Sequence, residues 1–137
     1  MKVVSACLAG QKCRYNSTSV SCKKVIELVK KGDAIVVCPE LLGGLSTPRS
    51  PAERKGNRVI TKDGADVTAQ FRDGAKKALK IALDNNCDLA ILKSNSPSCG
   101  CGQIYDGTFT GKLISEDGEF TKLLKKHHIK VITENNI

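Results

Sequence analysis

Short runs of apolar residues alternate with amphipathic stretches along this chain. The apolar runs are continuous, as in strands that are covered on both faces of a sheet, and they predict β-strands at 3–6, 35–37, 89–92 and 129–133. Between these runs, apolar residues recur with helical spacing and predict helices at 21–32, 68–86 and 118–127. Ser21 is suited to be the N-cap of the first helix, and Gly32 to end it.

This alternation of strand and helix predicts an α/β fold. We expect a small three-layer Rossmann-like domain with a mainly parallel sheet of about four strands, right-handed crossovers and an added β-hairpin. A chain of 137 residues is long enough for a hydrophobic core, and 1–137 is most simply one domain.

Two segments interrupt the alternation. The first, 39–66, contains prolines and several glycines, and irregular segments of this length are usually lids or binding loops. Within it, 58–61 is expected to form a short strand. The second is Asp106-Gly107, which lies between 103–105 and 108–110 and is a strong signal for a two-residue hairpin turn.

Three cysteines lie where predicted strands end. Cys7 follows the first strand, Cys38 follows the second, and Cys99 follows the third after a short polar loop. Ligands bind outside the carboxyl ends of the strands in open parallel sheets, so these thiols can meet although they are far apart in sequence. Three thiolates suit a metal ion or an iron–sulfur cluster with one coordination position left open.

The other four cysteines divide into two groups. Cys22 lies on the apolar stripe of the first helix and Cys87 precedes the third strand at its amino-terminal edge, so we assign both to packing. Cys13 and Cys101 lie close to candidate ligands. Either one as a fourth ligand would close the site and favour structural zinc.

Polar residues near the same strand ends are candidates for chemistry. Glu40 comes two residues after Cys38, where a carboxylate can activate a water molecule or move a proton, although it can also be a solvated or capping acid. The polar loop 94–100 can hold an anion or orient a substrate oxygen, and we predict Ser98 there as substrate-binding. Arg49 lies in a loop between two prolines and is predicted to clamp a phosphate or a carbonyl.

Composition and charge narrow the choice of partners. The net charge is +8, from 22 basic and 14 acidic residues, which favours an anionic partner such as a nucleotide phosphate or nucleic acid, or else only keeps the surface soluble. Aromatic residues make up 4% and Trp is absent, which argues against a stacking platform for single-stranded nucleic acid. We expect no membrane span, no signal peptide and a cytoplasmic protein, because the apolar runs are short.

Several motifs in one order resemble the TudS-type thiouracil desulfidases, over nearly the whole chain. They are Ser5-Ala6-Cys7-Leu8, Cys38-Pro39-Glu40, Gly43-Gly44-Leu45, Pro48-Arg49, Lys93 with Ser96-Pro97-Ser98-Cys99-Gly100, and Ile104-Tyr105-Asp106-Gly107-Thr108-Phe109. The ordered set is far more specific than any single motif.

The resemblance implies a [4Fe–4S] cluster on Cys7, Cys38 and Cys99, with Glu40 and Ser96 as catalytic residues. The implied activity is non-redox conversion of a thiolated uracil base or nucleotide, of the 2-thiouracil or 4-thio-UMP class, to the carbonyl form with release of hydrosulfide. One departure is that Asn16 and Ser17 follow Arg14-Tyr15, where the family usually has Asp-Gly or Gly-Gly.

Some relatives carry an additional C-terminal domain and resemble tRNA desulfidases. Because this chain stops at Ile137, we expect a small substrate rather than a folded RNA. The alternative from another class is a non-catalytic zinc protein that binds nucleic acid. It would use Cys7, Cys38 and Cys99 together with Cys13 or Cys101.

Overall fold

A four-stranded parallel sheet forms the centre of the molecule. The computed structural model describes residues 1–137, and the strand order is β2 (Ala34–Val37), β1 (Lys2–Ser5), β5 (Leu89–Leu92) and β8 (Lys130–Thr133). In register, Val4 of β1 pairs with Val36 on one side and Ile91 on the other. The predicted parallel sheet is confirmed, and its strands agree with the prediction to within one residue at each end.

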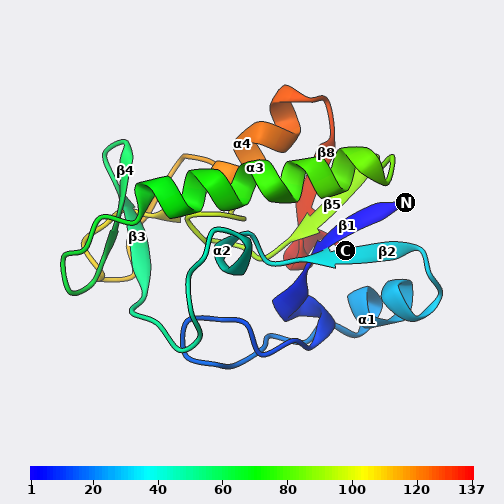
Figure 1. Ribbon diagram of the computed structural model, residues 1–137, viewed down its shortest axis with the longest axis horizontal. Helices are drawn as coiled ribbons and strands as arrows, with labels where there is room; N and C mark the ends of the chain where they lie inside the picture. Colours follow the sequence, from blue (N-terminus) through cyan, green and yellow to red (C-terminus); the bar gives the residue numbers. More distant parts are fainter.

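Helices cover both faces of this sheet. Figure 1 shows α3 (Thr68–Asp84) and α4 (Glu119–Lys126) on one side, and α1 (Lys23–Lys30) on the other. Side chains alternate along each strand, so Val3 packs under α3 and α4 while its neighbour Val4 packs towards α1. Burying each such side chain contributes about 1.5–3 kcal/mol relative to leaving it exposed. The three-layer Rossmann-like architecture is therefore confirmed.

The helix α3 follows its predicted apolar stripe. Its buried side chains include Phe71, Ala75, Ala78, Leu79 and Ala82. The first helix begins at Lys23, and its N-cap is Cys22 instead of the predicted Ser21. No side chain caps this helix.

The segment 39–66 is more regular than predicted. It contains the short helix α2 (Pro39–Leu42) and a hairpin of β3 (Ala52–Lys55) with β4 (Arg58–Thr61), which stands beside one end of α3 in Figure 1. The strand β3 was missed because its sequence is polar. Its buried Arg54 forms an ion pair with Glu119, with 3.3 Å between Nη2 and Oε1.

The predicted two-residue hairpin at Asp106-Gly107 is wrong. Instead β6 (Ile104–Tyr105) pairs with β7 (Leu113–Ile114), and 106–112 form a loop. The Asp106 carboxylate accepts hydrogen bonds from the Thr108 amide at 2.9 Å and from its hydroxyl at 2.6 Å. These contacts turn the chain locally, and 108–110 form no strand.

The chain ends in a 3₁₀ turn, η2 (Glu134–Asn136), directly after β8. None of the helices combines the length and the apolar character needed to cross a membrane.

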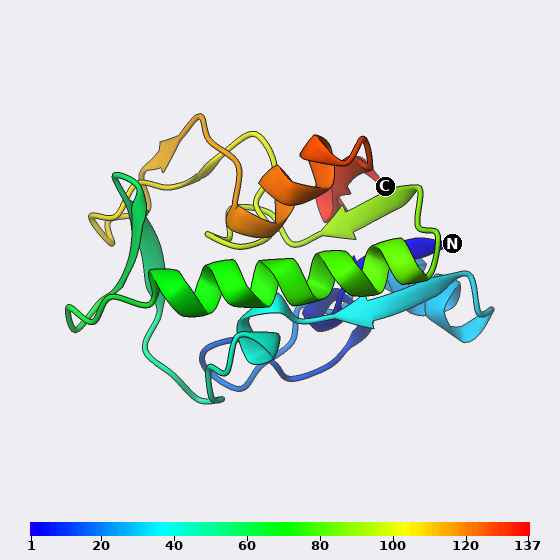
Figure 2. The same cartoon turned by 45° about the horizontal axis from the view of Figure 1, so that its top comes forward.

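Close contact between α2 and α3 fixes the position of α2. A Cβ atom added to Gly74 on α3 would lie 1.8 Å from the carbonyl oxygen of Pro39. A Cβ atom on Gly43, directly after α2, would lie 2.0 Å from the carbonyl oxygen of Gln70. Both views show α2 lying alongside α3 (Figures 1 and 2). Only glycine permits this approach, which holds the end of β2 and the start of α2 against the long helix.

We predict that Gly74→Ala destabilises the protein by about 1–3 kcal/mol, because the added methyl group forces α2 away from α3. A loss of stability would point to the packing against α2, since helix propensity alone would make the Ala protein more stable by about 1 kcal/mol. Urea denaturation measures the change. Lys76→Ala, at an exposed position of the same helix, is the control and should leave the stability almost unchanged. A Gly74→Ala protein as stable as the wild type would contradict the packing.

Candidate active site

A cavity of about 380 Å³ opens at the carboxyl ends of the central strands. In Figure 2, β2 and β5 point towards this end of the molecule, where the β3–β4 hairpin stands. Four of the seven cysteines line the cavity: Cys7, Cys13, Cys38 and Cys99. The three cysteines predicted to meet are thus brought to one place, and Cys13 joins them.

Each of the three predicted thiols has its own strand. Cys7 lies in η1 (Ala6–Ala9), the 3₁₀ turn that directly follows β1. Cys38 is the residue between β2 and α2 and has the extended backbone of an N-cap. Cys99 lies in the loop after β5, where the Ser5 hydroxyl donates a hydrogen bond to its Sγ at 3.4 Å. Because β1 lies between β2 and β5, the three thiols come from three adjacent strands.

Contacts between thiols and burial raise the pKa of Cys13, Cys38 and Cys99. Contact with Cys13, together with burial, raises the pKa of Cys38 well above its ordinary value. Burial raises the pKa of Cys99 to about 12, against the opposing hydrogen bond from Ser5. Contact with Cys38 lowers the pKa of Cys13, but contact with Cys7 and burial outweigh it and raise the pKa to about 11. Any metal bound here must therefore displace protons from the thiols.

The four thiols line one cavity, but they are not arranged around one metal ion. No group of three or more His, Cys, Asp or Glu side chains is arranged to hold one metal ion. Cys101 lies outside the cavity, and its thiol donates to the carbonyl oxygen of Val131 at 3.8 Å. A structural zinc site needs four ligands around one ion, so this arrangement does not support the alternative zinc protein.

Glu40 lies in the cavity wall with Arg49 as its partner. Oε1 of Glu40 accepts from Nε of Arg49 at 3.3 Å and from Nη2 at 3.2 Å. The Glu40 side chain is 24% exposed and that of Arg49 is 9% exposed. Burial raises the pKa of the Glu40 carboxyl above its ordinary value, while the charge and hydrogen bonds of Arg49 oppose the rise. The carboxylate is thus partly desolvated but held in one place.

The contacts of Arg49 do not fit the predicted phosphate clamp. Besides Glu40, its guanidinium donates to the carbonyl oxygen of Ser46 at 3.1 Å and to that of Cys13 at 3.0 Å. Its own backbone amide donates to the carbonyl oxygen of Tyr15 at 2.7 Å. The protein itself therefore uses most of the donors of this side chain, and we assign Arg49 to the positioning of Glu40.

The two predicted serines lie in different surroundings. Ser96 lines the cavity, and its Oγ accepts from the amide of Ser98 at 3.0 Å and from that of Cys99 at 3.1 Å. Since these bonds use only its lone pairs, the hydroxyl proton stays free to donate. Ser98 is completely buried, outside the cavity wall, and its Oγ has no hydrogen-bond partner. The structure therefore does not place Ser98 where a substrate could reach it.

Comparison with known proteins decides the family. The model of the family described as 2-thiouracil desulfurase matches residues 3–136. The chain belongs to the 2-thiouracil desulfurase family. It is 45% identical to the uncharacterized protein YbbK of Bacillus subtilis strain 168, over all of this chain and 97% of that protein. A solved structure described as a [4Fe-4S]-dependent thiouracil desulfidase, TudS, superposes with a TM-score of 0.92 at 45% identity, covering 98% of this chain and 91% of the other.

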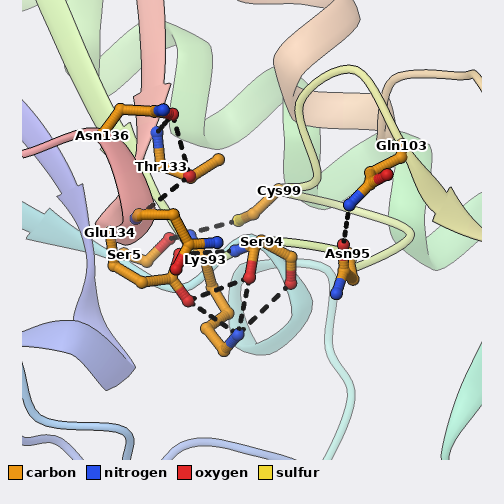
Figure 3. A network of polar contacts seen from close by, with 10 residues as sticks. Ser5, Lys93, Ser94, Asn95, Cys99, Gln103, Thr133, Glu134 and Asn136 are labelled. Carbon is orange, nitrogen blue, oxygen red and sulfur yellow. Dashed lines mark hydrogen bonds and ion pairs between the residues drawn. The ribbon is translucent and has the colours of Figure 1, made fainter.

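In this family member, a polar network that sequence reasoning missed supports the wall around Cys99 (Figure 3). Glu134 of η2 accepts from the Ser94 amide at 2.8 Å and from its hydroxyl at 3.0 Å, and pairs with Lys93 at 2.8 Å between Oε2 and Nζ. The Lys93 amide donates to Oγ of Ser5, which in turn donates to Cys99. The end of the chain thereby fixes the loop that carries Cys99. Nothing in the spacing of Glu134 indicated this contact.

The cations of the cavity wall are of two kinds. Arg49 and Lys93 are neutralised by Glu40 and Glu134. Arg14 and Lys62 also line the cavity, but their side chains take part in none of the ion pairs or side-chain hydrogen bonds of the structure. The Arg14 guanidinium lies over the Tyr15 ring, with 5.5 Å to its centroid, and its charge opposes the rise of the Glu40 pKa. The sequence indicated the net positive charge of the chain but did not single out Arg14 and Lys62.

Proposed function

We propose that this member of the 2-thiouracil desulfurase family is a non-redox, [4Fe–4S]-dependent desulfidase. It converts a thiolated uracil base or nucleotide to the carbonyl form and releases hydrosulfide. The observation that carries this proposal is the cavity in which three thiols from adjacent strands face one half-buried carboxylate. The similarity to the solved desulfidase supports the same reading.

The residues of the cavity fit an iron–sulfur cluster. Thiols are soft ligands, and each cysteine that holds a cubane binds a different iron, so its ligands surround a space instead of converging on one ion. Cys7, Cys38 and Cys99 would hold the cluster. Such a cluster would leave one iron without a protein ligand, and that iron would supply a soft Lewis acid for a thiocarbonyl group.

Glu40 provides the base for the water molecule that replaces the sulfur. A general base must lie within hydrogen-bond reach of the proton that it removes, and Glu40 faces the same cavity as the thiols. The carboxylate takes one proton from water, and the water oxygen bonds to the thiocarbonyl carbon. The carbon–sulfur bond then breaks, and the second proton of the water leaves on the sulfur as hydrosulfide. Oxygen comes from water and no electrons are transferred, so the reaction needs no redox partner.

Arg49 and Ser96 support this reaction without taking part in bond making. Arg49 holds Oε1 of the Glu40 carboxylate by two hydrogen bonds, which leaves Oε2 free to act as the base. The free proton of the Ser96 hydroxyl can orient the water or the substrate. All seven cysteines are free thiols, which suits the reducing cytoplasm, where we place the enzyme.

We predict that Cys7→Ala, Cys38→Ala and Cys99→Ala each abolish stable cluster binding, because each removes one of three ligands. Anaerobic reconstitution followed by iron and sulfide analysis measures this. Cys22→Ala and Cys87→Ala are matched controls outside the cavity and should bind a full cluster. Cys13→Ala should also retain it. A full, stable cubane in any of the first three variants, or its loss from Cys13→Ala alone, would show that the ligand set is wrong.

We predict that Glu40→Gln binds the cluster normally but turns over about 10²–10⁴ times more slowly, the usual cost of losing a general base. Glutamine has nearly the shape of glutamate but cannot accept the proton. Single-turnover kinetics on the cluster-loaded protein give the rate. Near-normal turnover by a cluster-loaded Glu40→Gln protein would remove Glu40 from the mechanism.

For a nucleotide substrate, Arg14 and Lys62 are the candidates to bind the phosphate. They are the cavity-lining cations that form no ion pair, so they can bind an anion without breaking one. A small nucleotide substrate would therefore explain the net positive charge of the chain, and no folded RNA partner is needed to account for it.

We predict that the Arg14→Ala/Lys62→Ala double variant lowers kcat/KM for 4-thio-UMP about 10- to 100-fold and affects 2-thiouracil less. A charge-assisted hydrogen bond contributes roughly 1.5–3 kcal/mol, which gives this range. Arg49→Ala is the comparison, and it should slow both substrates equally because it acts through Glu40. Equal losses on both substrates in the Arg14→Ala/Lys62→Ala protein would contradict the phosphate assignment.

A further inference from the structure

The aromatic residues of the chain are divided sharply between core and cavity. The chain has two tyrosines, three phenylalanines and no tryptophan. Phe71 and Phe120 are fully buried in the core. The other three rings, Tyr15, Tyr105 and Phe109, all line the cavity. One face of Tyr15 is already covered by the Arg14 guanidinium.

Phe109 is held in an unusual backbone conformation. Its φ angle is +57°, in the left-handed region that bulky residues rarely adopt. Conformations of this kind persist only where the surrounding structure fixes them, and they concentrate at ligand clamps and active sites. The loop 106–112 that carries Phe109 lies beside the β3–β4 hairpin in both views (Figures 1 and 2).

Glu53 of β3 is the residue that fixes this loop. Its Oε1 accepts hydrogen bonds from the amide of Gly107 at 3.0 Å and from the amide of Phe109 at 3.1 Å. Glu53 is only 9% exposed and forms no ion pair with a basic side chain. Its charge is therefore balanced by backbone amides alone, and the carboxylate acts as an anchor for the loop.

Close packing at Gly107 completes the anchor. A Cβ atom on Gly107 would lie 2.6 Å from the carbonyl oxygen of Arg54, and its φ angle is +96°. The loop thus lies directly against the backbone of β3, which limits how far the backbone that carries Phe109 can move away from the cavity.

We propose that Phe109 stacks on the heterocyclic ring of the substrate and that Glu53 is the positioning residue that holds Phe109 in place. The inference rests on the proposed function for the identity of the ring, which is a planar pyrimidine. Stacking on a ring fixed in advance orders the substrate without a movement of the loop. Glu53 takes no part in the chemistry, although it lines the cavity as a buried acid.

The absence of tryptophan from the chain allows a direct test. Phe109→Trp places a single indole at the stacking position of the cluster-loaded protein. Titration with 2-thiouracil, and with the product uracil, should quench its fluorescence saturably. Leu83→Trp is the matched control, because Leu83 is 43% exposed on α3 and lies outside the cavity, and its fluorescence should change only by absorption of the added ligand. Equal changes in the two variants would overturn the stacking.

Kinetics test the part that we assign to Glu53. Phe109→Ala should raise KM for 2-thiouracil about tenfold or more, the effect of losing one base–aromatic stack, with a much smaller change in kcat. Glu53→Ala should raise KM in the same way, and the Glu53→Ala/Phe109→Ala protein should be no worse than Phe109→Ala alone. Glu53→Gln keeps an acceptor oxygen for both amides and should stay near the wild type.

The outcomes separate this inference from the proposed function. Saturable quenching of the Phe109→Trp protein without turnover by the cluster-loaded wild type would leave the stacking in place and overturn the desulfidase. Turnover by Phe109→Ala with an unchanged KM would overturn the stacking and leave the desulfidase in place. Additive effects of the Glu53 and Phe109 substitutions would show that Glu53 acts independently of Phe109.

Discussion

Parallel pairing of β1 with both β2 and β5 is the constraint on which the site depends. It directs three chain segments that are far apart in sequence to the same edge of the sheet, and each delivers one thiol there. Hydrophobic packing on both faces fixes the register, because a slip by one residue would turn every strand side chain to the opposite face. The thiols are therefore placed by the core, and no contact among the thiols themselves is needed to bring them together.

Three ion pairs around the cavity each fix an element that shapes the site, whereas the buried Glu53 is held by backbone amides. Arg49 holds Glu40, Glu134 holds the loop after β5, and Arg54 joins the β3–β4 hairpin to Glu119 on α4. Removing one partner of such a pair leaves a desolvated charge, so these contacts resist loosening. Arg14 and Lys62, the cavity-lining cations that form no ion pair, are the ones that we propose for the substrate phosphate.

Sequence alone predicted the parallel sheet, the layers and the meeting of Cys7, Cys38 and Cys99, because apolar runs and strand ends are local signals. It missed β3, since Glu53 and Arg54 are buried by partners that lie far away in sequence. The hairpin at Asp106-Gly107 was misplaced for the same reason, because Glu53 captures two amides of that loop. The sequence indicated Arg49 as a site residue. Its hydrogen bonds to Glu40 could not be predicted, because they depend on how α2 and the loop that carries Arg49 fold against each other.

The central claim is that three cysteines of this cavity hold a cubane cluster and leave one iron for the substrate. Mössbauer spectroscopy of the anaerobically reconstituted protein, with and without 2-thiouracil, tests it most directly. We expect one iron that is distinct from the other three and that alone changes its signal when the substrate is added. Four iron sites that are unaffected by the substrate, or a colourless protein that takes up stoichiometric zinc instead, would contradict it.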